Sequence, residues 1–571
     1  MKDPRDWDLE YDGAAPPLPK KMRRKTGKWT ERVQRLTPQG AHLLWLEPRI
    51  ERGDTGSPPP KAFAGVLRIL HQESEDSFFT SGSGDLYVCS SDWINEFDKK
   101  LNEAKDDRER LKLLQFPHQD YRYYLRLESL WITSREEVIL GLDTYRLDDE
   151  DRGWQRRQPL TLRVDNGADG RQRRAADGMH PVFNSLDTRV GRIRMTYVSE
   201  MARHATIVIH AVSDVGTPSD QTDWGTALKD SGWIVNVESD VIPILPQHVP
   251  SGGAWTRHAL KSYHRDHIDA DLPRPRFAAW RYHLLVVSDL QMGAEDEEGP
   301  NGVMYDVGDF RRQGLPRQGA AIAARRKKKW PLPSMKNDAE SEESELQDNP
   351  ELFYRTALHE LGHMQGLYHN PGQQGIMQPT EFIDKLSALD LRHSPIDAFR
   401  LWHLPDLWVM PGGVPFGYRY KAAAVDVLDL IPESPGLRLS MKPMTMVAGG
   451  EPEDLVLTLH NASSRAVLCP NSRHVEPRYG RLGALLRTPA GSWEEIWSVR
   501  FPRRVGGLGS TSLLSGETIV FRVSWDYKPR ALRQGGLHQL HAHLSWVVDY
   551  PTSGGERIYY RVSAEAPLRV T

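Results

Sequence analysis

The segment from His359 to His369 reads HELGHMQGLYH and contains three histidines whose spacing suits a metal ion. On an α-helix, His359 and His363 differ by about 40° around the axis, so their rings face one point. Gly366 comes three residues later, where a residue free to adopt a positive φ angle can end the helix and turn the chain back. That turn brings His369 to the same point. Three imidazole ligands with one open position are typical of a catalytic Zn²⁺ site.

Glu360 follows the first histidine directly and predicts hydrolytic chemistry. Bound Zn²⁺ polarises a carbonyl group and lowers the pKa of its water to about 7. A carboxylate at this position can take a proton from that water and later pass it to a leaving amine. We therefore expect one catalytic Zn²⁺ on His359, His363 and His369, with Glu360 as the general base and a protein or peptide as the substrate.

A helix has to hold the first two ligands, and the preceding residues favour one. Asn349 and Pro350 are a typical N-cap and first-turn pair. The ligands continue a stripe at helical spacing, formed by Leu352, Thr356, His359 and His363. A neighbouring apolar stripe suits a core and consists of Phe353, Ala357, Leu361 and Met364. We expect a helix from about residue 350 to the turn at Gly366.

At these residues the chain resembles the metzincin clan of zinc metallopeptidases. The long zinc motif of that clan is matched by His359, Glu360, His363, Gly366 and His369. Metzincins also place a tight turn with a methionine beneath the metal. Residues 375–379, GIMQP, follow the third histidine at the distance seen in the matrixin branch. The resemblance implies a zinc endopeptidase with a matrixin-like active site, in which Met377 is the structural floor beneath the metal.

The chain also departs from the matrixins. Their zymogens block the zinc with a cysteine in a PRCGxPD-type segment, and neither Cys89 nor Cys469 has that context. The histidine- and aspartate-rich loop that gives matrixins a second zinc and calcium is not recognisable. The acidic residues 295–298 are the candidate for Ca²⁺, although they lack the alternating spacing of a dedicated calcium loop. We therefore expect no latency through a cysteine. A Ca²⁺ ion in addition to the catalytic Zn²⁺ stays open.

The composition is that of a globular protein with several domains, since 39% of the 571 residues are hydrophobic and 9% are aromatic. The 74 basic and 77 acidic residues nearly cancel, so we expect no nucleic acid as a partner. Two cysteines far apart cannot form a disulfide framework, which favours a reducing compartment. No stretch is apolar enough for a signal peptide or a membrane span. We expect a cytoplasmic protein without a membrane anchor, with non-classical export as the alternative.

The first third of the chain divides into segments of different character. Residues 1–36 combine prolines with a basic run and predict a flexible tail. Residues 37–165 contain strand-like runs such as GAHLLWLEP and RYYLRLESLWI, which predict a β-rich accessory domain. Residues 166–190 are polar and typical of a linker.

Residues 191–412 are expected to form the catalytic domain. The segments ATIVIHAV, DWGTALKDSGW and IVNVES are typical of a strand, a helix and a second strand. The resemblance implies a mixed twisted sheet, the active-site helix and a C-terminal helix, whose start is indicated by Ser394 and Pro395. It also implies that substrate binds antiparallel to an edge strand above the zinc helix, near residues 302–306. The charged residues 325–349 predict a mobile insertion.

Residues 418–571 contain short alternating strands separated by glycine, proline and asparagine turns. They predict an antiparallel β-sandwich similar to immunoglobulin-like accessory domains, which position an enzyme or bind a protein partner. The whole chain is therefore expected to be a multidomain α+β protein, with a metzincin-like catalytic domain between β-rich flanks.

Two other functions fit the same sequence. The first is a binding or scaffold protein that keeps the metal site without useful turnover. The second is a highly specific peptidase that acts on one partner, as an effector or toxin does. Zinc content, cleavage of a peptide library and cleavage of a single partner distinguish these functions from a general endopeptidase.

Overall fold

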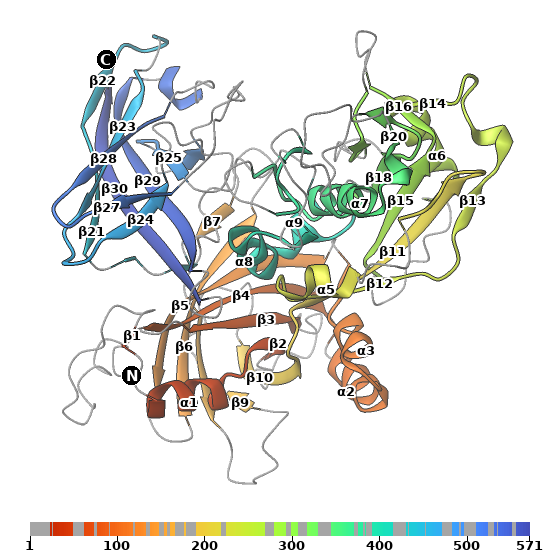
Figure 1. Cartoon of the computed structure of the whole chain (residues 1–571). Coiled ribbons are helices and arrows are strands. Elements are labelled where there is room, and N and C mark those ends of the chain that lie inside the picture. The colour runs from red at the N-terminus through yellow and green to blue at the C-terminus, as the bar shows by residue number, and fades with distance from the viewer. Residues whose placement is uncertain are drawn as a thin grey trace.

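The computed structural model describes residues 23–24, 27–48, 62–73, 77–90, 92–117, 120–132, 137–147, 154–156, 160–165, 176–178, 190–218, 224–268, 279–292, 299–305, 317–328, 344–370, 375–380, 383, 391–414, 430–431, 433–434, 436–450, 453–470, 482–489, 493–495, 510–523, 530–533, 535–550 and 556–571. These residues form several sheets and a smaller share of helices, which confirms the prediction of a multidomain α+β chain (Figure 1). No helix in this part of the chain has both the length and the hydropathy of a membrane span.

The N-terminal part forms a ten-stranded sheet that closes on itself. Its strands are β1 (Arg23–Arg24), β2 (Gly40–Pro48), β3 (Ala62–Glu73), β4 (Ser77–Cys89), β5 (Tyr121–Ile132), β6 (Glu137–Leu147), β7 (Trp154–Arg156), β8 (Leu160–Asp165), β9 (Ala176–Gly178) and β10 (Val190–Ser199). They follow the order β1-β4-β3-β2-β10-β9-β8-β6-β5, and a pairing between β4 and β5 closes the ring. Alternate side chains share a face, so leucines such as Leu44 and Leu46 fill the inside. Two helices follow β4, namely α2 (Trp93–Glu103) and α3 (Asp107–Lys112).

The end of the predicted flexible tail is folded. Residues 27–36 form helix α1 (Gly27–Leu36), in which Val33 and Leu36 are buried. Leu36 joins the leucine core of the N-terminal sheet, and burial of such a side chain stabilises the helix that carries it. The prediction of a tail is therefore wrong for these residues, and residues 1–22 lie outside the described part of the chain.

The boundary between the first two domains lies later than the sequence indicated. Strand β10 lies in the segment predicted to begin the catalytic domain, but it pairs antiparallel with β2, with Thr196 opposite Leu43. Strand β9 falls within the predicted linker, 166–190, and pairs with β10. The backbone hydrogen bonds of β10 thus place it in the N-terminal sheet, which extends to Ser199. The rest of the predicted linker lies outside the described residues.

The central part holds a second, mixed sheet. Its strands are β11 (Arg203–Val212), β12 (Trp233–Val237), β13 (Ile242–Ile244), β15 (Arg281–Val287), β17 (Gly302–Val303) and β18 (Gly319–Ala323). The order is β12-β11-β15-β18-β17, and β13 also pairs with β11. Every pair is parallel except β17 with β18, which is antiparallel. The described sheet therefore ends, on one side, at a short antiparallel strand.

Helices cover both faces of this sheet. They are α5 (Trp224–Lys229), α6 (Arg257–His267), α7 (Pro350–Met364), α8 (Pro395–His403) and α9 (Asp406–Val409). Phe353 of α7 shares a core with Leu284 and Ile322 on one face of the sheet. Leu260 of α6 packs with Leu285 on the opposite face, because neighbouring residues of a strand point to opposite sides. Strand β14 (Ala254–Thr256) pairs with β16 (Asp289–Gln291) beside α6.

The ends of the charged segment 325–349, predicted to be mobile, are folded. Strands β19 (Lys327–Lys328) and β20 (Ser344–Glu345) pair antiparallel and lead to the 3₁₀ turn η5 (Leu346–Asp348). Leu346 is fully buried, and Glu345 and Asp348 form a reciprocal cap around that turn. Burial and capping therefore fix the approach to α7. Residues 329–343 lie outside the described residues.

The C-terminal part consists of strands around one core. They are β21 (Leu437–Met441), β22 (Met444–Met446), β23 (Leu455–Asn461), β24 (Val467–Pro470), β25 (Leu482–Arg487), β26 (Trp493–Glu495), β27 (Ser510–Leu513), β28 (Thr518–Val523), β29 (Gly536–Tyr550) and β30 (Glu556–Val570). They form the sheets β21-β23-β28, β22-β30-β29-β25-β26 and β24-β27. Leu457 and Phe521 from the first sheet share a core with Leu540 and Val562 from the second.

A buried polar network joins the N-terminal sheet to the start of α9. Asp406 is 1% exposed and accepts hydrogen bonds from Tyr87 Oη at 2.9 Å and from Arg203 Nη2 at 3.1 Å. Arg68 Nη1 lies 3.3 Å from the same carboxylate and also pairs with Asp85. The backbone N–H of Asp406 donates to Asp85 Oδ1 at 3.1 Å. Two carboxylates and two guanidiniums thus balance one another inside the protein.

The last turn of α8 lies in the same contact. His403 is fully buried, and its two ring nitrogens lie 2.9 Å from Ser81 Oγ and 3.0 Å from Ser83 Oγ. Tyr124 Oη donates to the His403 carbonyl at 2.9 Å. The N-terminal sheet therefore supports α8 and α9 directly.

We predict that Asp406→Asn destabilises the protein by about 3–5 kcal/mol, because Arg68 and Arg203 lose the carboxylate that neutralises them in a buried site. The free energy of unfolding from chemical denaturation measures the effect. The control is Glu238→Gln, which removes the partly exposed ion pair with Arg281 and should cost about 1 kcal/mol or less. Equal costs for the two variants would contradict the role of the network.

Candidate metal centre

Helix α7 begins and ends where local interactions require it. The Asn349 side chain accepts a hydrogen bond from Leu352 N at 3.3 Å, and Pro350 occupies the first turn. After the helix, Gly366 has a φ angle of 83°, which favours glycine. A Cβ atom on Gly366 would also lie 2.4 Å from the carbonyl oxygen of Trp408. Conformation and space therefore both require glycine at the turn that precedes His369.

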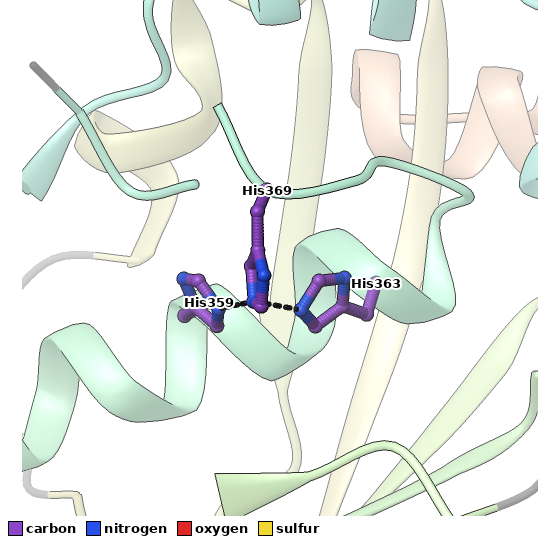
Figure 2. A group of neighbouring side chains, drawn as sticks. All are labelled: His359, His363 and His369. Atoms are coloured by element: carbon purple, nitrogen blue, oxygen red, sulfur yellow. Dashed lines mark hydrogen bonds between the residues drawn. The ribbon is translucent and has the colours of Figure 1, made fainter. Parts of the chain in front are cut away.

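The structure brings the three motif histidines together (Figure 2). His359 and His363 project from α7, and His369 comes from the chain that returns past the helix. Nε2 of His369 lies 3.0 Å from Nε2 of His359 and 3.1 Å from Nε2 of His363. Tetrahedral coordination with Zn–N distances of 2.0–2.1 Å separates ligand nitrogens by about 3.3 Å. Both distances are close to that value, and all three ligand atoms lie within 4.8 Å of one another, so the group can share one Zn²⁺.

The hydrogen bonds of the other ring nitrogens explain why a cation fits. Nδ1 of His359 lies 2.6 Å from the Ile376 carbonyl oxygen, and Nδ1 of His363 lies 2.9 Å from the Leu367 carbonyl oxygen. A carbonyl only accepts, so both rings carry their hydrogen on Nδ1 and present an Nε2 lone pair to His369. A hydrogen on His369 Nε2 could serve one of these lone pairs at a time, whereas a central cation serves all three.

Burial favours the neutral, ligand-competent form of the first histidine. The pKa of His359 lies well below its usual value, mainly because the side chain is buried. The neighbouring imidazoles of His363 and His369 and the guanidinium of Arg355 lower it further. Neutral imidazole is the form that binds a metal. The site thus offers uncharged nitrogen donors, and Zn²⁺ accepts such ligands readily.

Met377 lies beneath the helix that carries the first two histidines. Its side chain is fully buried, and a Cβ atom on Gly362 would lie 2.3 Å from the Met377 sulfur. The Met377 carbonyl accepts a hydrogen bond from Asn370 N at 2.7 Å. The turn that contains Met377 is therefore tied to the residue after His369.

Glu360 is buried next to the short edge strand β17. Its side chain is close enough to Gly302 that a Cβ atom there would lie 2.8 Å from Glu360 Oε1. Burial raises the pKa of Glu360 to about 8, and a hydrogen bond from the backbone N–H of Met304 acts in the opposite direction. A cation on the neighbouring histidines would lower this pKa again. The carboxyl group is thus confined between α7 and β17.

The strand above Glu360 is anchored from behind. Tyr305, two residues after β17, has its Oη 3.0 Å from His264 Nδ1 of α6. His264 Nε2 in turn lies 3.2 Å from Gln318 Oε1. A Cβ atom on Gly319 would collide with Tyr305 Oη, so this contact also needs a glycine in β18. Of the residues 302–306 predicted at the cleft, 302–305 are described and run beside the site.

Sequence reasoning missed several residues that support the centre. Arg355 is buried one helical turn before His359 and binds the turn that contains Met377. Its position four residues before His359, on the same face of the helix, was the signal that the sequence offered. Asn370 Nδ2 donates to Asp397 Oδ2 at 3.0 Å, and Ser394 Oγ donates to the same oxygen at 2.7 Å. The cap of α8 is therefore bonded to the residue that follows the third ligand.

Neither a protein-family model nor a curated protein matches this chain. The assignment of the site depends on its residues and their geometry. Among the described residues, His359, His363 and His369 are the one group of three or more metal-ligating side chains close enough to share an ion. The acidic residues 295–298, the candidate for Ca²⁺, lie outside the described residues.

We predict that the protein binds one Zn²⁺ per chain and that His363→Ala weakens this binding by more than 100-fold. The variant removes a ligand, and loss of a group that only hydrogen-bonds to a ligand already lowers metal affinity by about 10–100-fold. Elemental analysis and competition with a chromophoric chelator measure stoichiometry and affinity. His258→Ala, on the exposed side of α6, is the control and should bind normally. Stoichiometric zinc of unchanged affinity in His363→Ala would rule out this ligand set.

Proposed function

We propose that this chain is a zinc-dependent endopeptidase of the metzincin type. One observation carries the proposal: Nε2 of His369 lies 3.0 Å and 3.1 Å from the Nε2 atoms of His359 and His363, on the helix that also carries the buried carboxyl group of Glu360. The donors would hold the metal through His359, His363 and His369. Glu360 lies on the same helix and would act on the water that attacks the substrate.

The residues divide the chemistry between them. Bound Zn²⁺ would polarise the scissile carbonyl group and acidify water in the open position. Glu360 would accept a proton from that water and return it to the leaving amine. Burial raises the pKa of this carboxyl group, and a cation on the histidines would lower it again and favour the carboxylate form that accepts the proton. The backbone N–H of Met304 donates to the Glu360 carboxyl group and would hold it in place.

The edge strand favours a peptide as the substrate. Strand β17 pairs antiparallel with β18 and ends the described strand order of the sheet. An extended peptide that adds to such a strand gains main-chain hydrogen bonds along its length. It would then cross the site next to Glu360, because Gly302 of β17 contacts that side chain. An extended internal segment of a protein suits this arrangement, which supports an endopeptidase.

Several further features support a metzincin-type, matrixin-like centre. The sheet is mixed with an antiparallel edge strand, the ligand helix α7 packs beneath it, and α8 follows the turn that contains Met377. Met377 lies under Gly362 of the zinc motif. Gly366, with a positive φ angle, forms the turn after the helix that carries the first two histidines. These are the elements that the resemblance implied.

The flanking parts have different roles in this proposal. The N-terminal sheet shares a buried network with α8 and α9 and stabilises the catalytic unit. The C-terminal strands have their own core and are proposed as an immunoglobulin-like module that binds a protein partner.

We predict that Glu360→Gln lowers kcat by about 10²–10⁴-fold, because the amide cannot accept the proton, while one Zn²⁺ stays bound. Cleavage of an unstructured peptide library, with and without a chelator, measures the activity. Glu351→Gln, an exposed position on the first turn of α7, is the matched control and should be fully active. Zinc-loaded protein that cleaves no peptide and no candidate partner would instead support a scaffold, and cleavage of a single partner an effector.

We predict that Gly302→Ala lowers kcat by about 100-fold, since the added methyl group would displace Glu360 or the edge strand by an amount on the order of 1 Å. Zinc content should not change, because Gly302 contacts Glu360 rather than the histidines. Gly216→Ala is the control, as a Cβ there meets no atom closer than 3.5 Å. Normal activity in Gly302→Ala would mean that β17 does not confine the carboxyl group.

A further inference from the structure

A buried arginine lies directly beside the metal centre. Arg355 is on α7, one turn before His359, and is fully buried. Its Nη2 donates to the carbonyl oxygens of Gly375 at 3.1 Å and Ile376 at 3.2 Å. It also donates to the carbonyl oxygen of Gln378. The two N–H bonds of this one Nη2 group are therefore shared among three carbonyls of the turn that contains Met377.

One of these carbonyls also determines how His359 is presented. The Ile376 carbonyl oxygen accepts a hydrogen bond from His359 Nδ1 at 2.6 Å. This contact fixes the hydrogen on Nδ1 and aims Nε2 at the other ligands. Arg355 and His359 thus share one acceptor, and a shift of that acceptor would rotate the ring.

The charge of Arg355 opposes the metal rather than attracting it. A guanidinium is always protonated, and a buried cation close to a site for Zn²⁺ repels the ion. An apolar side chain would continue the buried face of α7 without that repulsion. What the guanidinium supplies is an Nη2 group whose two N–H bonds are held in the plane of the rigid guanidinium and point at the carbonyls of the turn.

Arg355 is the donor that the three carbonyls of the turn share, although Gln378 N also donates to the Gly375 carbonyl at 3.1 Å and His359 Nδ1 to that of Ile376 at 2.6 Å. The backbone of the turn is held at its edges, where Ile376 N donates to the Arg392 carbonyl at 2.9 Å and Asn370 N donates to the Met377 carbonyl at 2.7 Å. The carbonyls of Gly375, Ile376 and Gln378 all turn towards Arg355. Arg355 and His359 are thus the two side chains that donate to the Ile376 oxygen in the described structure.

We propose that Arg355 is a positioning residue of the metal centre: it fixes the Ile376 carbonyl that orients His359, and so sets the coordination geometry and the retention of Zn²⁺. This inference rests on the proposed zinc site. It assigns Arg355 no contact with substrate and no proton transfer. A lysine can replace the charge but not the planar donors, so Arg355→Lys separates geometry from electrostatics.

The experiment compares Arg355→Lys, Arg355→Gln and the wild type. We expect Zn²⁺ to dissociate to a chromophoric chelator about 10–100-fold faster from both variants. We also expect a shifted visible absorption spectrum of the Co²⁺-substituted protein, since the position of His359 changes. With peptide substrate, kcat should fall while KM stays within about twofold, because β17 is not altered.

Arg203→Lys is the matched control. Arg203 is also buried and donates to three backbone carbonyls, those of Leu401, Trp402 and Leu404, but at the contact with the N-terminal sheet. This variant should lower the unfolding midpoint and leave the Co²⁺ spectrum and the Zn²⁺ dissociation rate unchanged. Should Arg355→Lys fail to fold, Arg355→Gln provides the same measurements with two N–H donors and no charge.

The outcomes separate this inference from the proposed activity. Wild-type spectra and dissociation rates in both Arg355 variants would overturn the positioning role, whatever the peptidase activity. Equal changes in Arg203→Lys would also overturn it, because they would reflect general destabilisation. Failure of the zinc-loaded wild type to cleave peptides would refute the activity, whereas the spectroscopic and dissociation results on Arg355 would still hold.

Discussion

Two hydrogen bonds from imidazoles to backbone carbonyls determine what the centre can do. His359 donates from Nδ1 to Ile376, and His363 donates from Nδ1 to Leu367. Helical spacing aligns the two side chains, but it does not decide which nitrogen faces inward. Because the carbonyls only accept, both Nε2 lone pairs turn towards His369. A pair of histidines on a helix becomes half of a metal site only when the chain returns past it with those two oxygens.

The return of the chain depends in turn on more distant parts of the protein. Arg317 is buried and donates to Met364 at the end of α7, at 2.9 Å, and to the Trp408 carbonyl, which lies against Gly366. Asp406, two residues before Trp408, accepts a hydrogen bond from Tyr87 of the N-terminal sheet. The turn before His369 therefore packs against a segment whose start is bound to the N-terminal strands. The N-terminal sheet is a structural part of the central unit.

Local interactions explain what could be predicted from the sequence. The caps at Asn349 and Ser394 are side-chain hydrogen bonds to residues three positions away, so short patterns contain them. The spacing of the histidines and the glycine at 366 likewise describe one helix and its end. For these elements the structure and the expectation agree, because every partner lies within a few residues along the chain.

Long-range pairing explains what could not be predicted. Strand β10 follows directly on the predicted linker, and its hydrogen bonds to β2 and β9 assign it to the N-terminal sheet instead of the central one. Arg68, Asp85 and Arg355 are charged residues that a pattern assigns to the surface, yet each is buried because its partners come from elsewhere in the chain. The contact between Gly302 and Glu360 also joins residues far apart in sequence.

X-ray absorption spectroscopy of the zinc-loaded protein tests the central claim most directly, since it counts ligands without requiring a substrate. The geometry of the three histidines predicts three imidazole nitrogens at about 2.0–2.1 Å and one further light atom in the open position. Two imidazoles or fewer, or a sulfur ligand, would contradict the site described at His359, His363 and His369.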